Sequence, residues 1–184
     1  MNPGGRPRVA GLVLAAAASL LVPGCRGRGA APVPETPGET GAPAAPAEQI
    51  VLFYPGDDTL LHRERREVPE LPGAVPPRIK LVVGELLAGS REGRPAAFPW
   101  MATVEAVFVD RAGNAFVDLS APPEGAIEGT ADEAVVVYAV VESVVANCPG
   151  VERVQLLFDG SEVATLGHLD LSRPLAPRPE LVAP

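Results

Sequence analysis

The stretch that decides the fold is "TADEAVVVYAVVESVVAN", Thr130 to Asn147. Its many valines favour a strand by intrinsic propensity, but two other features favour a helix. The first four residues have the Thr-x-x-Glu spacing of a capping box, which marks a helix start. The apolar run that follows is far longer than the about five or six residues of an ordinary strand. We therefore predict a helix, whose buried face should consist of Val136, Val137, Val140, Val141, Val144 and Cys148.

The residues before this helix predict two strands and a shorter helix. "QIVLFY", from Gln49, is apolar, β-prone and closed by a Pro-Gly pair, which predicts a strand. "HRERREVP", from His62, predicts a short exposed strand with alternating charges. Pro77 begins a helical pattern that Gly89 is well placed to end. The apolar side of that helix is expected to consist of Ile79, Val82, Val83 and Leu86.

Two hairpins are predicted on either side of the valine-rich helix. Residues 103–110 and 114–120 are alternating segments joined by Arg-Ala-Gly, which indicates a β-hairpin. After the helix, "VERVQLLFDGSEVATL" predicts a second hairpin with Asp159-Gly160 as its turn. Two helices segregated against a mostly antiparallel sheet make an α+β domain.

The length of the chain allows one such domain. We expect it to span residues 49–175, and we expect the Pro-rich residues 176–184 to form a flexible tail.

The N-terminus has the pattern of a lipoprotein signal peptide. Arg6 and Arg8 precede 14 nearly unbroken apolar residues, fewer than the roughly 20 that span a bilayer. A positive start, a short apolar core and small residues at its end are typical of a secretory signal. "VPGC", which ends at Cys25, resembles the bacterial lipobox, in which a lipid is attached to the cysteine and cleavage leaves it first. We predict a signal peptide over residues 1–24 and lipidation of Cys25; an ordinary signal with an incidental cysteine is the alternative.

The residues that follow predict a tether. Residues 25–48 are rich in Pro, Gly and Ala and cannot bury enough apolar surface to offset the entropy of ordering. A Pro-rich linker of this length reaches roughly 70 Å when extended, and two or more acyl chains hold a protein firmly on a membrane. We expect an exported protein, lipid-anchored to the cell envelope membrane. In a Gram-negative cell, Arg26 in place of Asp favours the outer membrane.

Charge argues against nucleic acid and anionic lipid surfaces as partners, and cysteine content argues against a disulfide within the chain. The formal net charge is -8, and it becomes -10 when Arg6 and Arg8 are removed with the signal peptide. An acidic chain repels nucleic acid and anionic lipid surfaces, so neither is expected as a partner. After lipidation only Cys148 remains, so no disulfide within the chain is available and we expect a buried thiol.

Four polar residues have the side-chain types of a hydrolase triad: Asp118, Ser120, His168 and Asp170. A triad depends on geometry, and no Gly-x-Ser-x-Gly motif surrounds Ser120. The structural interpretation is that Asp118 and Ser120 cap a strand end, while His168 and Asp170 order a closing turn. We therefore predict no catalytic residue.

Other residues that could hold a metal or cofactor lack the required pattern. His62, His168 and Cys148 are too scattered for a zinc site. "GELLAGS" lacks the Lys of a phosphate-binding loop. Asp57-Asp58 could lie near a calcium ion, but a turn between strands explains the pair at least as well. No cofactor or metal is predicted.

The order of several segments resembles the GerMN domain, which is named from a spore-germination lipoprotein and occurs in many bacterial envelope proteins. The resemblance covers residues 49–175, and its most specific pieces are Val117–Ser120 and Gly167–Asp170 with Pro174. The segments are "VLFYPGDDTLLHRERREV", "ELLAG", "VFVDRAGNAFVDLS", "VERVQLLFDG" and "LGHLDLSRPL".

The resemblance has departures as well as implications. "AGSREGRPAAFPW" stands where family members often have Gly-Pro followed by an Ile-Pro pair, and one copy of the domain is present where the germination protein has two. The resemblance implies an α+β domain similar to the ring-building motifs of secretion systems, usually on a lipoprotein and without known catalytic residues. The family-motif residues with implied structural roles are Asp118, Ser120, Gly167, His168 and Asp170.

Three functions remain as hypotheses. The first is a non-catalytic domain that docks onto an envelope protein or assembly, which predicts an exposed sheet edge or apolar patch near "HRERREV" or Trp100. The second is a binding module for a small molecule or cell-wall polymer, which predicts a pocket with converging polar groups. The third is a hydrolase, which requires Ser120 and His168 within hydrogen-bond reach. The oligomeric state is left open.

Overall fold

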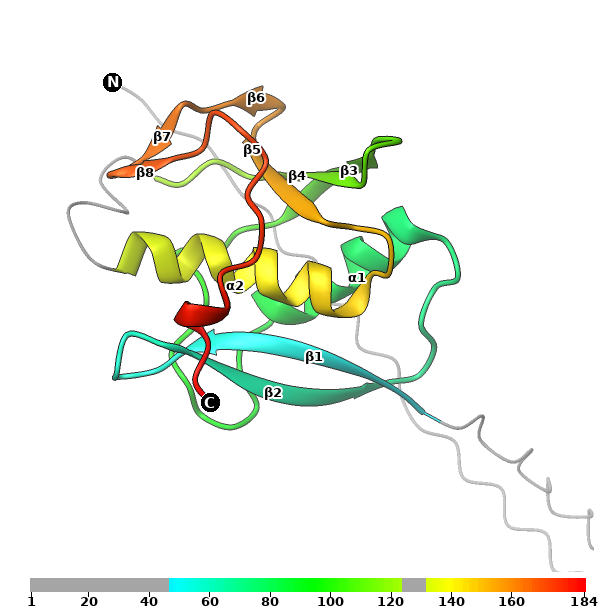
Figure 1. Ribbon diagram of the computed structural model, residues 1–184. Coiled ribbons are helices and arrows are strands. Elements are labelled where there is room, and N and C mark those ends of the chain that lie inside the picture. Colours follow the sequence, from blue (N-terminus) through cyan, green and yellow to red (C-terminus); the bar gives the residue numbers. More distant parts are fainter. Residues whose placement is uncertain (1–46, 124–131) are drawn as a thin grey trace, which may run out of the picture. The chain divides into compact units, whose positions relative to one another are not determined.

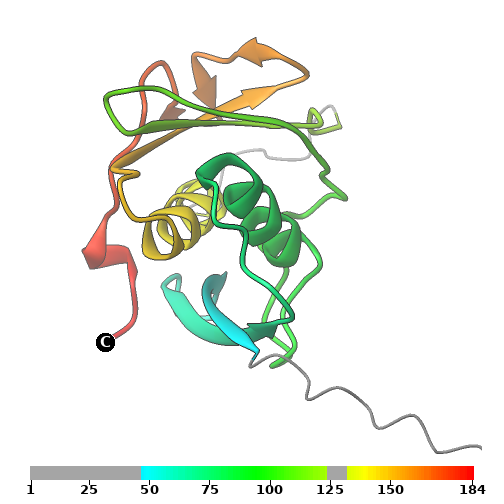
Figure 2. The same ribbon diagram turned by 90° about the vertical axis from the view of Figure 1, so that its right-hand side faces the viewer.

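Two helices lie between a two-stranded sheet and a four-stranded sheet (Figures 1 and 2). The computed structural model describes residues 47–123 and 132–184. The helices are α1 (Val75–Leu87) and α2 (Asp132–Asn147). The strands are β1 (Glu48–Pro55), β2 (Leu61–Val68), β3 (Val104–Val109), β4 (Asn114–Leu119), β5 (Arg153–Phe158), β6 (Ser161–Glu162), β7 (Thr165–Leu166) and β8 (Leu169–Asp170), and a short 3₁₀ helix, η1, spans Pro179–Leu181.

The two-stranded sheet is the antiparallel pair of β1 and β2. The prediction of a strand at "HRERREV" is confirmed, but the prediction that it is exposed is wrong in part. Glu64 and Arg66 are each only 2% exposed, whereas Arg63, Arg65 and Glu67 are exposed. Side chains alternate between the two faces of a strand, and one face of β2 is turned toward the helices. The alternating charges therefore lie alternately inside and outside the domain.

The four-stranded sheet has the order β3-β4-β5-β6. The predicted β3–β4 hairpin is confirmed, as is the β5–β6 turn at Asp159-Gly160. Both turn residues have positive φ, 49° and 74°, as in the turns that suit the twist of a two-residue hairpin. β4 and β5 are parallel, because α2 carries the chain from the end of one strand back to the start of the other. Residues 165–166 do not extend the second hairpin but pair with β8.

The core lies around the two helices. All four apolar residues predicted for α1 are fully buried, and Gly89 follows the helix with φ of 92°, as expected of a glycine that ends it. The six residues predicted for the buried face of α2 are also buried. α2 packs against β1 on one side and β5 on the other, which explains why it is apolar around most of its circumference. The α+β class is confirmed; Thr130 of the capping box lies outside the described residues.

The last nine residues do not form the flexible tail that we predicted. Val182 forms a parallel bridge with Leu61, and the Ala183 N–H donates to the Leu61 carbonyl at 2.9 Å. Just upstream, Leu175 and Val154 form an antiparallel bridge, with hydrogen bonds of 2.8 and 2.9 Å in the two directions. The prolines suggested a loose segment, but the aliphatic side chains between them pack against the core. Their burial outweighs the Pro-rich composition.

The N-terminal predictions are not addressed by the described residues. The signal peptide, Cys25 and the linker up to residue 46 lie outside them. None of the described helices is both long enough and apolar enough to cross a membrane.

Candidate functional site

Asp118 and Ser120 both hold the end of β4 in place. One oxygen of the Asp118 carboxylate accepts the Gly160 N–H at 2.9 Å, which ties β4 to the β5–β6 turn. The Ser120 hydroxyl accepts the Thr103 N–H at 3.0 Å, and the Ser120 N–H donates to the Thr103 carbonyl at 3.0 Å. These contacts are structural ones, at the end of a strand.

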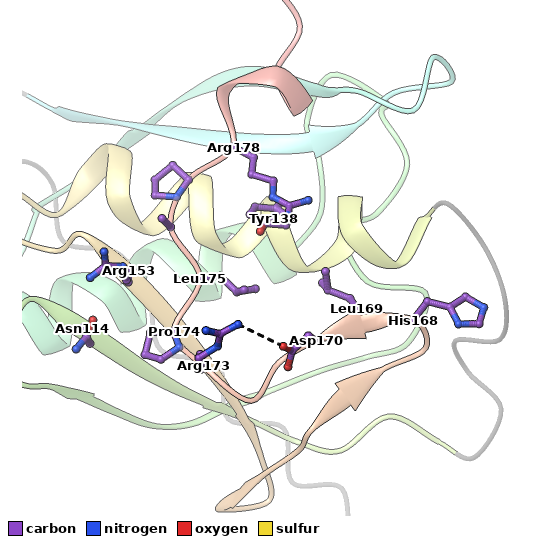
Figure 3. A pocket seen from close by; sticks show the side chains of 12 residues that line it. Asn114, Tyr138, Arg153, His168, Leu169, Asp170, Arg173, Pro174, Leu175 and Arg178 are labelled. Atoms are coloured by element: carbon purple, nitrogen blue, oxygen red, sulfur yellow. Dashed lines mark ion pairs between the residues drawn. The ribbon is translucent and has the colours of Figure 1, made fainter.

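Gly167, His168 and Asp170 shape the β7–β8 connection. Gly167 has φ of 56°, and a Cβ at this position would overlap the carboxylate of Glu133. That carboxylate accepts the His168 N–H at 2.5 Å, whereas the imidazole of His168 is exposed and points away from the neighbouring groove (Figure 3). Asp170 accepts the N–H and the hydroxyl of Ser172, at 2.9 and 2.6 Å. These hydrogen bonds hold the pKa of the Asp170 carboxyl below its usual value.

The residues of the candidate triad are not brought together as a nucleophile and its base. Within the part of the chain that the structure describes, no hydrogen bond joins Ser120 to His168, and the Ser120 hydroxyl is occupied by the Thr103 N–H. The same described ranges contain no group of three or more His, Cys, Asp or Glu side chains that could hold a metal ion. Burial raises the pKa of the Cys148 thiol to about 11, which keeps it protonated and unreactive at neutral pH.

Arg66 is the centre of a buried polar cluster that joins β2 to the end of α1. Its guanidinium contacts the Glu64 carboxylate at 2.5 Å, the Glu85 carbonyl at 2.6 Å and the Gly89 carbonyl at 2.8 Å. Tyr54 donates to the Leu86 carbonyl at 3.1 Å. A cation at the C-terminus of a helix is favourable because unpaired carbonyls give that end a partial negative charge. The cluster therefore fastens the β1–β2 sheet to α1.

The outer edge of β1 is covered by side chains of α2. The Asn147 amide accepts the Val51 N–H at 2.9 Å and donates to the Val51 carbonyl at 2.6 Å, as a neighbouring strand would. Ser143 accepts the next outward N–H, from Phe53, at 3.0 Å. The missed sequence signal was the Ser143–Asn147 pair, two polar residues four positions apart on a mostly apolar helix.

No residue in the described ranges covers the outer edge of β3 in this way. Phe108 pairs with Phe116 in β4, so antiparallel geometry directs the backbone groups of Val107 and Val109 away from β4. Neither of their N–H groups finds an acceptor among the residues that the structure describes. β3 is therefore an edge strand with unpaired donors and acceptors, the kind of edge to which another strand can be added.

An exposed aromatic residue lies beside this open edge. Phe108 is 61% exposed on the outer face of the sheet, and its cross-strand neighbour Phe116 is half-buried on the same face. The two places that the sequence suggested for an exposed patch, Trp100 and "HRERREV", do not form one. Trp100 packs edge-on against buried Phe98 with ring centroids 4.8 Å apart, and "HRERREV" contributes Arg66 to the buried cluster. The missed signal was that Phe108 alternates with the inward-facing Val107 and Val109.

A groove of about 880 Å³ lies beside the C-terminal segment, near the starts of β4 and β5 (Figure 3). Three arginines line it: Arg153 at the start of β5, and Arg173 and Arg178 on the C-terminal segment. The Arg178 guanidinium lies 4.9 Å from the centre of the Tyr138 ring, and its backbone N–H donates to the Glu142 carboxylate at 2.6 Å. The sequence signal for this groove was the presence of Arg173 and Arg178 close together near the end of an acidic chain.

Comparison with known proteins supports one family. Residues 51–164, which run from β1 to just before β7, match the family described as "Germane: Sporulation and spore germination". The chain belongs to the Germane family. The GerMN resemblance inferred from the sequence is thereby confirmed. The comparison with curated proteins found no match. The Germane family is not known for an enzymatic activity.

Solved structures show the same fold for the Germane domain. The first GerMN domain of the sporulation protein GerM from Bacillus subtilis is 18% identical, with a TM-score of 0.52 over 70% of this chain and 97% of that one. The tandem GerMN domains of GerM are 19% identical, with a TM-score of 0.51 over 71% of this chain and 46% of that one. A candidate lipoprotein from Clostridium perfringens is 20% identical, with a TM-score of 0.49 over 71% of this chain and 87% of that one.

Proposed function

We propose that this protein is an exported lipoprotein whose Germane domain docks onto another envelope protein through the open edge of β3. The lipobox-like end of the signal peptide supports lipidation of Cys25, and residues 25–48 would serve as the tether. The docking proposal rests on a difference between two strand edges. Side chains of α2 cover the outer edge of β1, whereas no described residue covers the outer edge of β3 beside Phe108.

The expected mode of binding is the addition of a strand. An extended segment of the partner would bond the outward backbone groups of Val107 and Val109, and an apolar side chain of that segment would cover Phe108 and Phe116. Each added backbone hydrogen bond contributes about 0.5–1.5 kcal/mol, and fully burying a phenylalanine contributes roughly 1.5–3 kcal/mol. Backbone bonds alone would give affinity without selectivity, so the aromatic pair would supply the preference for one partner.

The polar residues of the family motif support a role without catalysis. The side chains of Asp118, Ser120 and Asp170 bond backbone groups or a neighbouring side chain of the same domain. Such contacts shape the end of β4 and the β7–β8 connection, and thereby hold the sheet that presents β3.

Crosslinking of the full-length protein in intact cells, followed by identification of the joined protein, tests the proposal. Val107→Pro removes an outward N–H without breaking a bond to β4, and Phe108→Ser removes the aromatic contact. Met101→Ser is the matched control, because Met101 is apolar and 98% exposed but lies outside the sheet. We expect one dominant envelope protein that is lost in the first two variants and retained in the control.

Three results would contradict the proposal. Equal crosslinking in all variants would exclude this edge, and a product made of two copies of the chain would replace the envelope partner with self-association. Unchanged membrane association of Cys25→Ser would exclude the lipid anchor.

A further inference from the structure

The groove beside the C-terminal segment has an unusual charge for this protein. The chain has a formal net charge of -8. Yet Arg153, Arg173 and Arg178 line the groove, and among the described residues that line it only Asp170 is acidic. In Figure 3 the arginines lie around the segment that contains Pro174 and Leu175. The residues that line the groove therefore include more positive than negative side chains, although the protein as a whole is acidic.

The guanidinium groups of these arginines have few ion-pair partners within the domain. The Arg173 side chain is 84% exposed, and its ion pair with Asp170 is long, at 3.8 Å. The other oxygen of that carboxylate is already bonded to Ser172. Arg153 and Arg178 are exposed, and neither forms an ion pair with any residue in the described ranges. Their guanidinium groups remain open to a ligand.

One of the three arginines is also held in position. Arg178 stacks on Tyr138, which α2 fixes, and the backbone N–H of Arg178 is anchored by Glu142. The segment upstream is fixed by the Leu175–Val154 bridge. A guanidinium that is oriented before binding loses less conformational entropy when a ligand arrives.

We propose that this groove binds an anionic polymer through phosphate or carboxylate groups. The planar guanidinium group offers paired N–H donors that match the two oxygens of either group. The groove is open, and its arginines come from β5 and from two positions of the C-terminal segment. This arrangement suits charges repeated along a chain better than a single enclosed ion. The negative charge of the rest of the protein disfavours polyanions elsewhere on its surface.

This site is independent of the proposed docking edge. β3 is at one edge of the four-stranded sheet, whereas the C-terminal segment bridges to β5 through Leu175 and Val154. A partner strand on β3 and a polymer in the groove could therefore be bound at the same time. Such a protein would hold an envelope protein beside an anionic polymer.

Binding of defined polymers to the purified full-length protein tests the proposal. Oligogalacturonate supplies carboxylates, poly(glycerol phosphate) supplies phosphates, and dextran of similar length supplies hydroxyls without charge. We expect one or both anionic polymers to bind, with affinity that falls as salt is added, and we expect dextran not to bind. The anionic polymer that binds more tightly identifies the group that the arginines recognise.

Charge-neutral variants locate the site. Arg153→Gln, Arg173→Gln and Arg178→Gln should each weaken binding by about tenfold, because each removes charged hydrogen bonds. Lys80→Gln, on an exposed position of α1, removes the same charge elsewhere and should leave the affinity unchanged. Phe108→Ser should also bind normally, which separates this site from the docking edge.

Either of two results would overturn the proposal: no binding of either anionic polymer, or equal loss of affinity in Lys80→Gln and the groove variants. If Arg153→Gln or Arg178→Gln fails to fold, Arg173→Gln alone decides the question, because that side chain is 84% exposed and its ion pair with Asp170 is long.

Discussion

The outer edges of β1 and β3 both present backbone N–H and carbonyl groups, but among the described residues only the edge of β1 is covered by side chains. On β1, the outward amides of Val51 and Phe53 bond Asn147 and Ser143 of α2. On β3, the outward amides of Val107 and Val109 find no acceptor within the described residues. An uncovered edge invites unwanted pairing, and proteins usually cover it. In this fold, Ser143 and Asn147 cover the edge of β1, which makes that edge structural. The edge of β3 lacks such cover within the described residues and is therefore suited to binding.

The largest expected effect concerns what fastens the covered sheet to the rest of the domain. Arg66→Met should lower the free energy of unfolding by about 3–5 kcal/mol, because it leaves the Glu64 carboxylate buried without its cation. Urea unfolding measures this change. Arg65→Met, one residue away on the exposed face of β2, is the control and should stay within about 0.5 kcal/mol of the unmodified protein. Equal effects of the two substitutions would show that the cluster does not hold the sheet.

Removing the cover from β1 should have the next largest effect. Asn147→Ala leaves the Val51 N–H and carbonyl without their partner, and each buried unpaired group costs about 1–3 kcal/mol. Ser143→Ala affects one N–H only, so it should destabilise less than Asn147→Ala in the same unfolding measurement. Asn147→Ala should also self-associate in size-exclusion chromatography, because it opens a second edge. A variant that stays monomeric and fully stable would remove the contrast between the two edges.

The buried cluster should also make the covered sheet sensitive to acid. Burial favours a higher pKa for Glu64, but hydrogen bonds from Ser90, Arg66 and the Arg91 N–H outweigh it and hold the pKa below its ordinary 4.5. A lowered pKa in the folded state stabilises the protein above the ordinary value, and this stabilisation is lost as the pH falls through the lowered value. The free energy of unfolding should therefore fall more steeply below pH 4.5 in the unmodified protein than in Glu64→Gln. Parallel curves would show that Glu64 does not titrate as described.

The smallest expected effect on stability is at the open edge. Phe108→Ser should change the free energy of unfolding by no more than about 0.5 kcal/mol, because the ring is largely in solvent. Phe53→Ser, on the covered strand, removes a buried ring and should cost about 3 kcal/mol or more. Thermal unfolding of the two variants compares the same substitution at the two edges. A large loss of stability in Phe108→Ser would give that residue a structural role.

Local patterns predicted the elements, but they could not predict contacts between distant residues. The spacing of Ile79 and Val82 and the turn at Asp159-Gly160 are properties of neighbouring residues, and the structure confirms both. The burial of Arg66 depends on carbonyls at the end of α1, roughly twenty residues further along the chain. The cover of β1 by Asn147 joins residues 96 positions apart. Exposure of Phe108 likewise depends on which face of the sheet the helices occupy.

Site-specific photo-crosslinking tests the central claim most directly. A photoreactive residue would replace either Phe108, at the open edge, or Arg65, on the exposed face of the covered sheet, in the full-length protein in its own cells. We predict that position 108 becomes joined to one envelope protein and that position 65 does not. The same product from both positions, or no product from position 108, would contradict docking at the edge of β3.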